Sequence, residues 1–537
     1  MKSLGTAYSN AIEPLRRNAG TGVSSLALAA DRGLIVLIVL SLYGLLMQHY
    51  PIIYGGDPIT RLMNSSRILN GHQLPLLQIL INGTMRWYHT SKSIFLLMAL
   101  ISSAACAGLH ALAWEITHDR RAARLAALFY ITHPFILYYS RVPYQEPLLT
   151  AGVAWGFCFL FRHPSASNRL LSSLFFGAAC FSRYEGWIAA LWAALYQIWK
   201  DRRQEEKTSL SSVIGSLISF GWAPAMWLVW NRNLSPPGSY VLDLGLHWAR
   251  LYRPFFIIKS ALWWTESVVV LAASIGFARS WLEPRLRNEG RFFPLAGSLV
   301  LLLSALVLSG HGIEPDAERI VTERESFLVI SVLVLYAGLG GSWLIGVFRE
   351  SCADSPLLRF GLPFLAVAVA AGYSLDRGVR RVEAANADPE LKTDYEVARF
   401  LVERQAGSLI LASPLPAEPL ANYLKNVEKW EGPRGREEAV QFLKKVETTP
   451  LDYQRVLTFS WMGKDKVFSG DALQGFDRPR VEGFLRERHI HYLIIFSDFT
   501  PVKEHERVVT ALIADHQAPE LVINNRGKSA RIYAIES

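Results

Sequence analysis

Long stretches without charged side chains alternate with short polar segments over the first 375 residues of the chain. Several stretches reach the roughly 20 residues that a helix needs to cross about 30 Å of hydrocarbon. The shorter stretches predict helices that use flanking residues to complete the crossing, that tilt little from the membrane normal, or that are broken. The pattern predicts eleven crossings, at 33–56, 93–114, 125–140, 147–161, 170–182, 186–199, 208–231, 260–278, 292–313, 326–348 and 360–375.

The charged residues divide the chain into two unlike parts. Residues 374–537 hold 24 Lys/Arg and 25 Asp/Glu, which leaves 31 basic and 21 acidic residues for the first 373 positions. With 51% hydrophobic residues overall, a disordered chain is excluded. We expect a membrane-embedded first part and a soluble second part. The net charge of +9 then reflects loops beside anionic lipid and not a nucleic-acid surface.

The basic residues also predict an orientation. If the N-terminus is cytoplasmic, the predicted inner loops carry more than twice the density of Lys/Arg of the outer loops, as the positive-inside rule requires. We therefore expect a cytoplasmic segment at 1–32, a transmembrane domain at 33–375 and an extracytoplasmic domain at 376–537. The first outer loop, 50–92, is expected to carry an interfacial helix. A prokaryotic inner or plasma membrane fits this plan.

The last part of the chain predicts a small α/β domain. A helical pattern at 393–407 ends at a glycine and leads into a strand-like run at 408–413, and 480–498 repeats the order of helix and strand. The segment 531–537 predicts a closing strand. No phosphate-binding loop, nucleophile elbow or metal-ligand spacing occurs. The expected fold class is a polytopic α-helical membrane protein with a C-terminal soluble α/β domain.

Two acidic residues mark the predicted outer boundary of the membrane. Asp57 is the first charged residue after the first span and precedes Pro58, so it suits a helix N-cap as well as a catalytic carboxylate. On the helix that follows, Arg61 is expected on the polar face. Glu146 lies in the short second outer loop before Pro147, where helix capping does not require a carboxylate.

A third polar group is expected at a turn between two spans. The apolar run around Arg183, Tyr184 and Glu185 is flanked on both sides by basic segments, so it has to cross the membrane and return. Arg183 then suits either an interfacial anchor or a ligand for phosphate oxygens. Further candidates of the same kind are Arg141, Glu266, Arg319 and Arg324.

Three segments together resemble a known family. They are GGDP and the following RLMNSSRILNGHQLP, then DRRAARLAALFYITHPFILYYSRVPYQEPLL, and then FFGAACFSRYEG. The resemblance continues into the last part of the chain with DYEVARFLVERQAGSLILASP and RHIHYLIIF. These segments are similar to the GT-C superfamily of membrane glycosyltransferases, in its branch of bacterial protein O-mannosyltransferase-like and lipid A aminoarabinose transferase-like proteins. One departure is that Pro58 stands where the family commonly has a second acidic residue. The oligosaccharyltransferase motif W-W-D-x-G is absent, which argues against transfer of whole glycans to asparagine.

The resemblance implies a glycosyltransferase that moves a sugar from a polyprenyl-phosphate-linked donor to an acceptor hydroxyl at the outer face of the membrane. Asp57 would be the general base or would orient the acceptor, and Glu146 would support it or bind a metal. Arg183 and Arg324 would bind the donor phosphate, with Glu185, Glu266 and Arg141 in support. The acceptor would be a lipid, a glycan or a protein, and the resemblance leaves a Mg²⁺ or Mn²⁺ ion open.

Three other classes of protein remain as alternatives. A sugar-polymer ligase or polymerase would be expected to use a large basic outer loop between late spans, and the loop at 231–259 is modest. A polytopic transporter would place its acidic residues near the midplane, whereas here they cluster at the outer boundary. A scaffold that presents the external domain would need far fewer spans.

Overall fold

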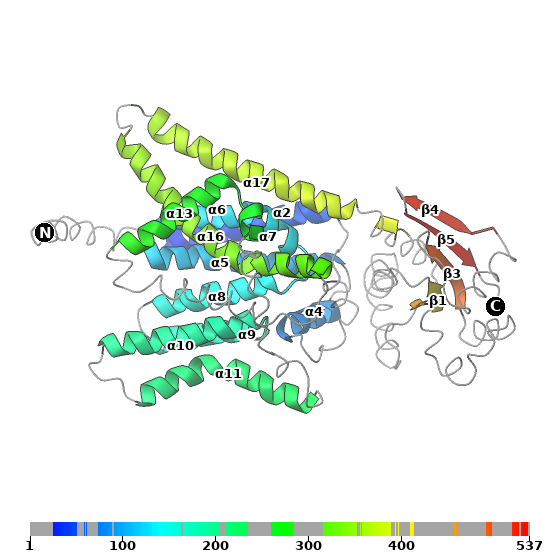
Figure 1. Ribbon diagram of the computed structural model, residues 1–537, viewed down its shortest axis with the longest axis horizontal. Coiled ribbons are helices and arrows are strands. Elements are labelled where there is room, and N and C mark those ends of the chain that lie inside the picture. The colour runs from blue at the N-terminus through cyan, green and yellow to red at the C-terminus, as the bar shows by residue number, and fades with distance from the viewer. Residues whose placement is uncertain are drawn as a thin grey trace, which may run out of the picture. The chain divides into compact units, whose positions relative to one another are not determined.

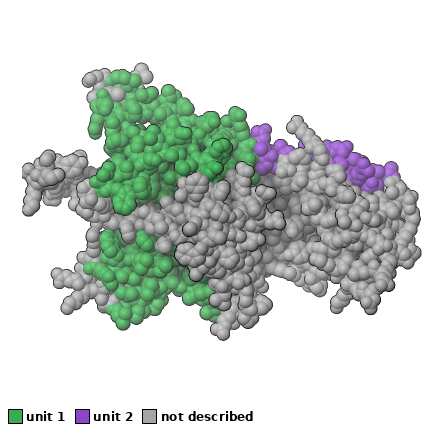
Figure 2. All heavy atoms as spheres, in the orientation of Figure 1, with its two compact units in different colours: residues 1–45, 70–77, 98–381 green, residues 46–69, 78–97, 382–537 purple. Residues whose placement is uncertain are grey.

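The computed structural model describes most of the first 387 residues and the strands of the C-terminal part. The described ranges are 25–50, 74–87, 91–162, 165–204, 210–234, 259–283, 315–351, 357–387, 409–412, 456–458, 490–496, 518–525 and 528–534, with a few single positions such as 58 and 61. The chain forms two compact units. Unit 1 comprises 1–45, 70–77 and 98–381, and unit 2 comprises 46–69, 78–97 and 382–537 (Figure 2).

Helices occupy nearly all of the predicted apolar runs (Figure 1). The run at 292–313 lies outside the described residues. In chain order the helices are α2 (Ser25–His49), α4 (Leu76–Trp87), α5 (Ser91–Thr117), α6 (Arg120–Thr132), α7 (Pro134–Ser140), α8 (Glu146–Phe161), α9 (Ala166–Cys180), α10 (Glu185–Gln204), α11 (Leu210–Leu234), α13 (Ser267–Leu282), α16 (Pro315–Ser351), η2 (Leu357–Gly361) and α17 (Leu362–Asn386).

Among the described residues, four helices are long and apolar enough to cross a membrane. They are found at Ser25–His49, Ser93–Thr117, Val213–Trp230 and Ser326–Ser351, with shorter apolar helices at Glu146–Phe161 and Ser267–Leu282. These helices are those of a multi-pass membrane protein. The count of eleven crossings, the choice of membrane and the orientation of the termini stay predictions.

Two of the predicted spans are broken. The run at 125–140 forms α6 and α7, because His133 has an extended backbone and its Nδ1 accepts a hydrogen bond from the Phe135 N–H at 3.3 Å, which caps α7. The run at 260–278 is interrupted at Thr265, and Glu266 is the N-cap of α13. Both breaks place polar side chains inside the apolar part of the sequence.

Three further differences from the sequence predictions concern helix bounds and burial. The loop predicted at 50–92 contains α4, whose apolar residues outweigh its internal Asn82-Gly83 turn signal. The charged segment predicted as an outer loop at 311–326 is helical from Pro315, as the first turns of α16. Arg61, expected on the polar face of an amphipathic helix, is 2% exposed, and its carbonyl accepts a hydrogen bond from Gln78.

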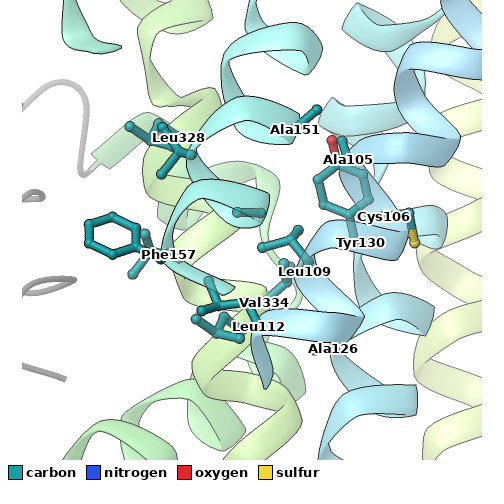
Figure 3. Packing of buried hydrophobic residues seen from close by; sticks show 14 of the residues in the cluster. Ala105, Cys106, Leu109, Leu112, Ala126, Tyr130, Ala151, Phe157, Leu328 and Val334 are labelled. Atoms are coloured by element: carbon teal, nitrogen blue, oxygen red, sulfur yellow. The ribbon is translucent and has the colours of Figure 1, made fainter. Parts of the chain in front are cut away.

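Side chains of α5, α6, α8 and α16 pack together in the core of unit 1 (Figure 3), to which α2, α9, α10, α11 and α13 also contribute. Glycines allow α16 to approach its neighbours closely. A Cβ atom at Gly340 would overlap the carbonyl of Ala272 on α13, and one at Gly276 would overlap the carbonyl of Tyr336 on α16. Two residues before Gly340, a Cβ at Gly338 would lie 2.6 Å from the carbonyl oxygen of Ala122 on α6. The backbone of α16 therefore packs directly against two helices.

The described strands of unit 2 form a five-stranded sheet in the order β2-β1-β3-β5-β4. Its strands are β1 (Leu409–Ala412), β2 (Val456–Thr458), β3 (Ile490–Phe496), β4 (Leu521–Asn525) and β5 (Lys528–Ala534). β1 pairs in parallel with β2 and β3, whereas β5 is antiparallel to β3 and β4. The predicted strands at 408–413 and within 480–498 are present, and the predicted closing strand begins at Lys528. The predicted helices of this domain lie outside the described residues, apart from the helical positions 393 and 396.

Candidate functional site

Glu146 occupies the first turn of α8. Gln145 is the N-cap and makes no capping hydrogen bond through its side chain, and Pro147 follows at the start of the helix, where its missing N–H costs nothing. The positive end of the helix dipole stabilises a carboxylate at this place. Glu146 is nevertheless 2% exposed, so its charge is held inside the helical unit and needs a cation nearby.

The cation comes from the turn between α9 and α10, which the structure places where the sequence predicted it. α9 ends at Cys180 and α10 begins at Glu185. The turn is tight, because a Cβ atom at Gly186 would overlap the backbone carbonyl of Ala179. Only glycine fits this position, which explains the glycine in the segment Arg183-Tyr184-Glu185-Gly186.

Arg183 joins two carboxylates that are distant in sequence. Its Nη1 donates to Glu146 Oε1 at 2.6 Å, and its Nε and Nη2 donate to Glu185 Oε1 at 2.9 and 2.6 Å. The side chains are 14% exposed for Arg183, 3% for Glu146 and 9% for Glu185. The three groups carry a net charge of −1, in surroundings where electrostatic interactions are stronger than in water.

Residues 74–76, in the middle of the first predicted outer loop, contact the other two predicted outer loops. The Leu76 N–H donates to the Phe181 carbonyl at 3.0 Å, and Gln145 Nε2 donates to the Leu74 carbonyl at 3.2 Å. These bonds join residues 74–76 to the segment before α8 and to the turn before α10. Three segments that are far apart in the sequence thus lie together around the Glu146–Arg183–Glu185 cluster.

The segment before α8 lies beside the middle of α5, because α7 leaves the direction of α6. Cys106 Sγ donates to the Ala127 carbonyl at 3.5 Å, and Ser102 Oγ to the Ser140 carbonyl at 3.4 Å. The two acceptors, Ala127 and Ser140, are thirteen residues apart, which would be about 20 Å in a straight helix. Their donors on α5 are four residues apart, which is about 6 Å. The bend at His133 therefore places the chain after α7 well inside the bundle.

A second ion pair lies at the other helix break. Arg377 Nη1 donates to Glu266 Oε1 at 3.0 Å, and its Nη2 donates to the Trp263 carbonyl at 3.0 Å. His133 Nε2 lies 3.0 Å from Thr265 Oγ1, so the two helix breaks are bonded to each other. Glu266 was predicted as a candidate, but Arg377 was not. Arg377 could have been selected because it follows the last apolar run by two residues. Nothing in the local sequence indicates that its partner is Glu266, 111 residues away.

The other predicted site residues are described in part. Asp57 lies outside the described residues. Arg324 belongs to α16, and the described parts do not include its side chain. Arg141 is the C-cap of α7 and is 1% exposed, so the helical unit encloses a further charged side chain five residues before Glu146. Within the described ranges, no group of three or more His, Cys, Asp or Glu side chains is arranged to hold a metal ion.

Neither a protein-family model nor a curated protein matches the sequence. Solved structures do. ArnT from Cupriavidus metallidurans bound to undecaprenyl phosphate is 14% identical and aligns over 93% of this chain and 97% of its own, with a TM-score of 0.55. Its apo structure aligns over the same shares, at 14% identity and a TM-score of 0.52. The arabinofuranosyltransferase AftD from Mycobacteria, 14% identical, aligns over 96% of this chain and 40% of its own; its TM-score of 0.46 supports no argument.

The chain shares its fold with ArnT. The resemblance predicted from the three motif segments is thereby confirmed for the architecture, in which many helices precede a C-terminal domain. At 14% identity the GT-C likeness concerns the fold. The reaction has to be argued from the residues of this chain.

Proposed function

We propose that the protein is a membrane glycosyltransferase that moves a sugar from a polyprenyl-phosphate-linked donor to an acceptor hydroxyl. The observation that supports this most is the Glu146–Arg183–Glu185 cluster, buried where three inter-helical segments meet. It occurs in a fold shared with ArnT, which was solved with undecaprenyl phosphate. A donor anchored in the bilayer needs polar groups at membrane depth, and this cluster supplies them.

The proposed reaction is a displacement at the anomeric carbon. The acceptor oxygen forms the new glycosidic bond while the bond to the phosphate oxygen breaks, and the polyprenyl phosphate leaves with the electron pair. A carboxylate takes the proton of the acceptor hydroxyl. Asp57, which precedes the segment bonded to the cluster, is proposed as this base. Glu146 is proposed to orient it or the acceptor.

Two different roles are considered for Arg183, positioning the carboxylates and binding the donor phosphate. Its three hydrogen bonds to Glu146 and Glu185 hold both carboxyl groups in place, which is a positioning role. A direct role towards the donor phosphate requires the phosphate to compete with a carboxylate, because the cluster already has a net negative charge. Arg324 is proposed as a second phosphate ligand. A divalent cation beside Asp57 and Glu146 would balance the cluster and the phosphate together.

The proposed setting is an inner or plasma membrane with the cluster and residues 376–537 on the outer side. The buried acidic cluster also suits a sugar-polymer ligase or polymerase, which performs the same displacement on a longer acceptor. It suits a transporter less, since transporters bind at interfaces between repeats and no repeat occurs in this sequence.

The deciding experiment compares lipid extracts and envelope glycans from cells with and without the gene by mass spectrometry. Accumulation of one polyprenyl-phosphate monosaccharide, with loss of one modified acceptor, is the expected result and names the donor. A gene copy with Glu146→Gln should reproduce the accumulation. Unchanged lipids and glycans in the deletion strain would refute a transferase of this kind.

A further inference from the structure

Three arginines lie on the first two turns of α6, next to α2. Arg120 donates from Nε to Asp31 Oδ2 at 2.6 Å and from Nη2 to Asp31 Oδ1 at 2.9 Å. Arg124 donates to the same two oxygens at 3.1 and 2.8 Å. Arg121 is exposed, and it lies three positions before Arg124, so the two are neighbours on the helix surface. We name Arg120, Arg121 and Arg124 the arginine patch.

The patch keeps hydrogen-bond donors available for an anion. The Asp31 side chain is 8% exposed, whereas those of Arg120 and Arg124 are 34% and 54% exposed, so the guanidinium groups cover the carboxylate. Both arginines bind Asp31 through Nε and Nη2. Arg120 also donates from Nη2 to the Ala27 carbonyl at 3.2 Å. Among the described residues, no partner binds Nη1 of either side chain. Three positive charges thus adjoin two carboxylates, Asp31 and the N-cap residue Asp119, whose Oδ1 accepts a hydrogen bond from the Arg121 N–H at 2.9 Å.

The surface next to the patch is apolar. α2 buries one stripe that contains Asp31, Ile35, Val39 and Tyr43, and it exposes the opposite side. Leu34 and Leu37 on that side are 57% and 64% exposed. α2 is long and apolar enough to cross a membrane, and its exposed apolar side suits contact with acyl chains. The arginine patch therefore lies beside the start of a lipid-facing surface.

We propose that the arginine patch binds the phosphate of an anionic phospholipid, whose acyl chains lie along α2. A guanidinium matches two phosphate oxygens at once, and clustered arginines at a membrane boundary attract anionic headgroups. The patch occupies the N-terminal end of α6, whereas α7 and the Glu146–Arg183–Glu185 cluster follow its C-terminal end. The lipid is thus not the donor, and the proposal holds whether or not the protein transfers a sugar.

The test is lipid binding by the purified full chain, followed by native mass spectrometry. The protein in a neutral detergent is titrated with phosphatidylglycerol and, separately, with phosphatidylcholine. We expect tighter binding of phosphatidylglycerol. Arg121→Gln and Arg124→Gln should each weaken it about ten- to a hundredfold, the effect of one charge-assisted contact. The matched control is Arg169→Gln, an exposed arginine in the first turn of α9 whose side chain bonds to no described residue; this variant should bind as the wild type does.

Several outcomes would overturn the proposal. They are equal affinity of the wild type for the two lipids, unchanged binding in both patch variants, and an equal loss in Arg169→Gln. Displacement of the lipid by inorganic phosphate at the same concentration would assign the patch to a free anion. If Arg124→Gln does not fold, Arg121→Gln decides, because the Arg121 side chain bonds to no described residue.

Discussion

Replacing Arg183 by methionine removes the cation that two buried carboxylates share. The change deletes hydrogen bonds of 2.6 Å to Glu146 and of 2.9 and 2.6 Å to Glu185. Because the two carboxylate side chains are 3% and 9% exposed, water does not replace the lost bonds. Removing one partner of a buried ion pair typically costs about 3–5 kcal/mol, and we expect the free energy of unfolding to fall by that amount.

The assay is reversible unfolding of the purified chain in mixed micelles, followed by tryptophan fluorescence. The matched control is Arg279→Met, which breaks the i,i+4 pair between Arg279 and Glu283, where the side chains are 36% and 37% exposed. Such a pair is worth about 0–1 kcal/mol. Adding Glu185→Gln to Arg183→Met should recover part of the loss, because an amide carries no charge to be left unpaired. Equal losses for Arg183→Met and Arg279→Met would refute the reasoning.

Three further predictions concern the site and the packing. Asp57→Asn should lower the transfer rate about 10²–10⁴-fold without loss of expression, and wild-type turnover would reduce Asp57 to a helix cap. Arg183→Lys should raise the donor KM about ten- to a hundredfold if the planar fork binds the phosphate, and equal KM values in nanodiscs would leave Arg183 a positioning role. Gly340→Ala should lower the free energy of unfolding by roughly 1–3 kcal/mol and so lower the thermal midpoint. Gly346→Ala should leave the midpoint unchanged, because a Cβ there would meet no atom within 4 Å. Equal midpoints for these two variants would contradict the close crossing of α13 and α16.

Local patterns in the sequence were sufficient to predict where most helices lie. Apolar runs indicate helices because each buried or lipid-facing turn has to satisfy its backbone internally. The turn at Arg183 followed from the same rule combined with flanking charge. The bend at His133 has a local signal in Pro134, since proline disrupts a helix. The break at Thr265 has no such signal, because hydropathy alone does not mark it.

The contacts of the site were harder to predict than its members. Glu146, Arg183 and Glu185 were each selected because charge is unexpected beside a span. Their pairing depends on α8, α9 and α10 packing together, which periodicity does not encode. The same holds for Glu266 and Arg377. The hairpin of β4 and β5 was missed although the segment Asn524-Asn525-Arg526-Gly527 carries a turn signal.

The glycine crossing between α13 and α16 limits how the helices can move. At Gly276 and Gly340 the two backbones touch, and larger residues such as Tyr336 lie one turn away. Sliding either helix by a turn would drive a side chain into the opposing carbonyl, so translation is blocked. Rotation about the point of contact remains. The crossing is therefore a fixed pivot, and any movement of one of these helices relative to the other is a rotation about it.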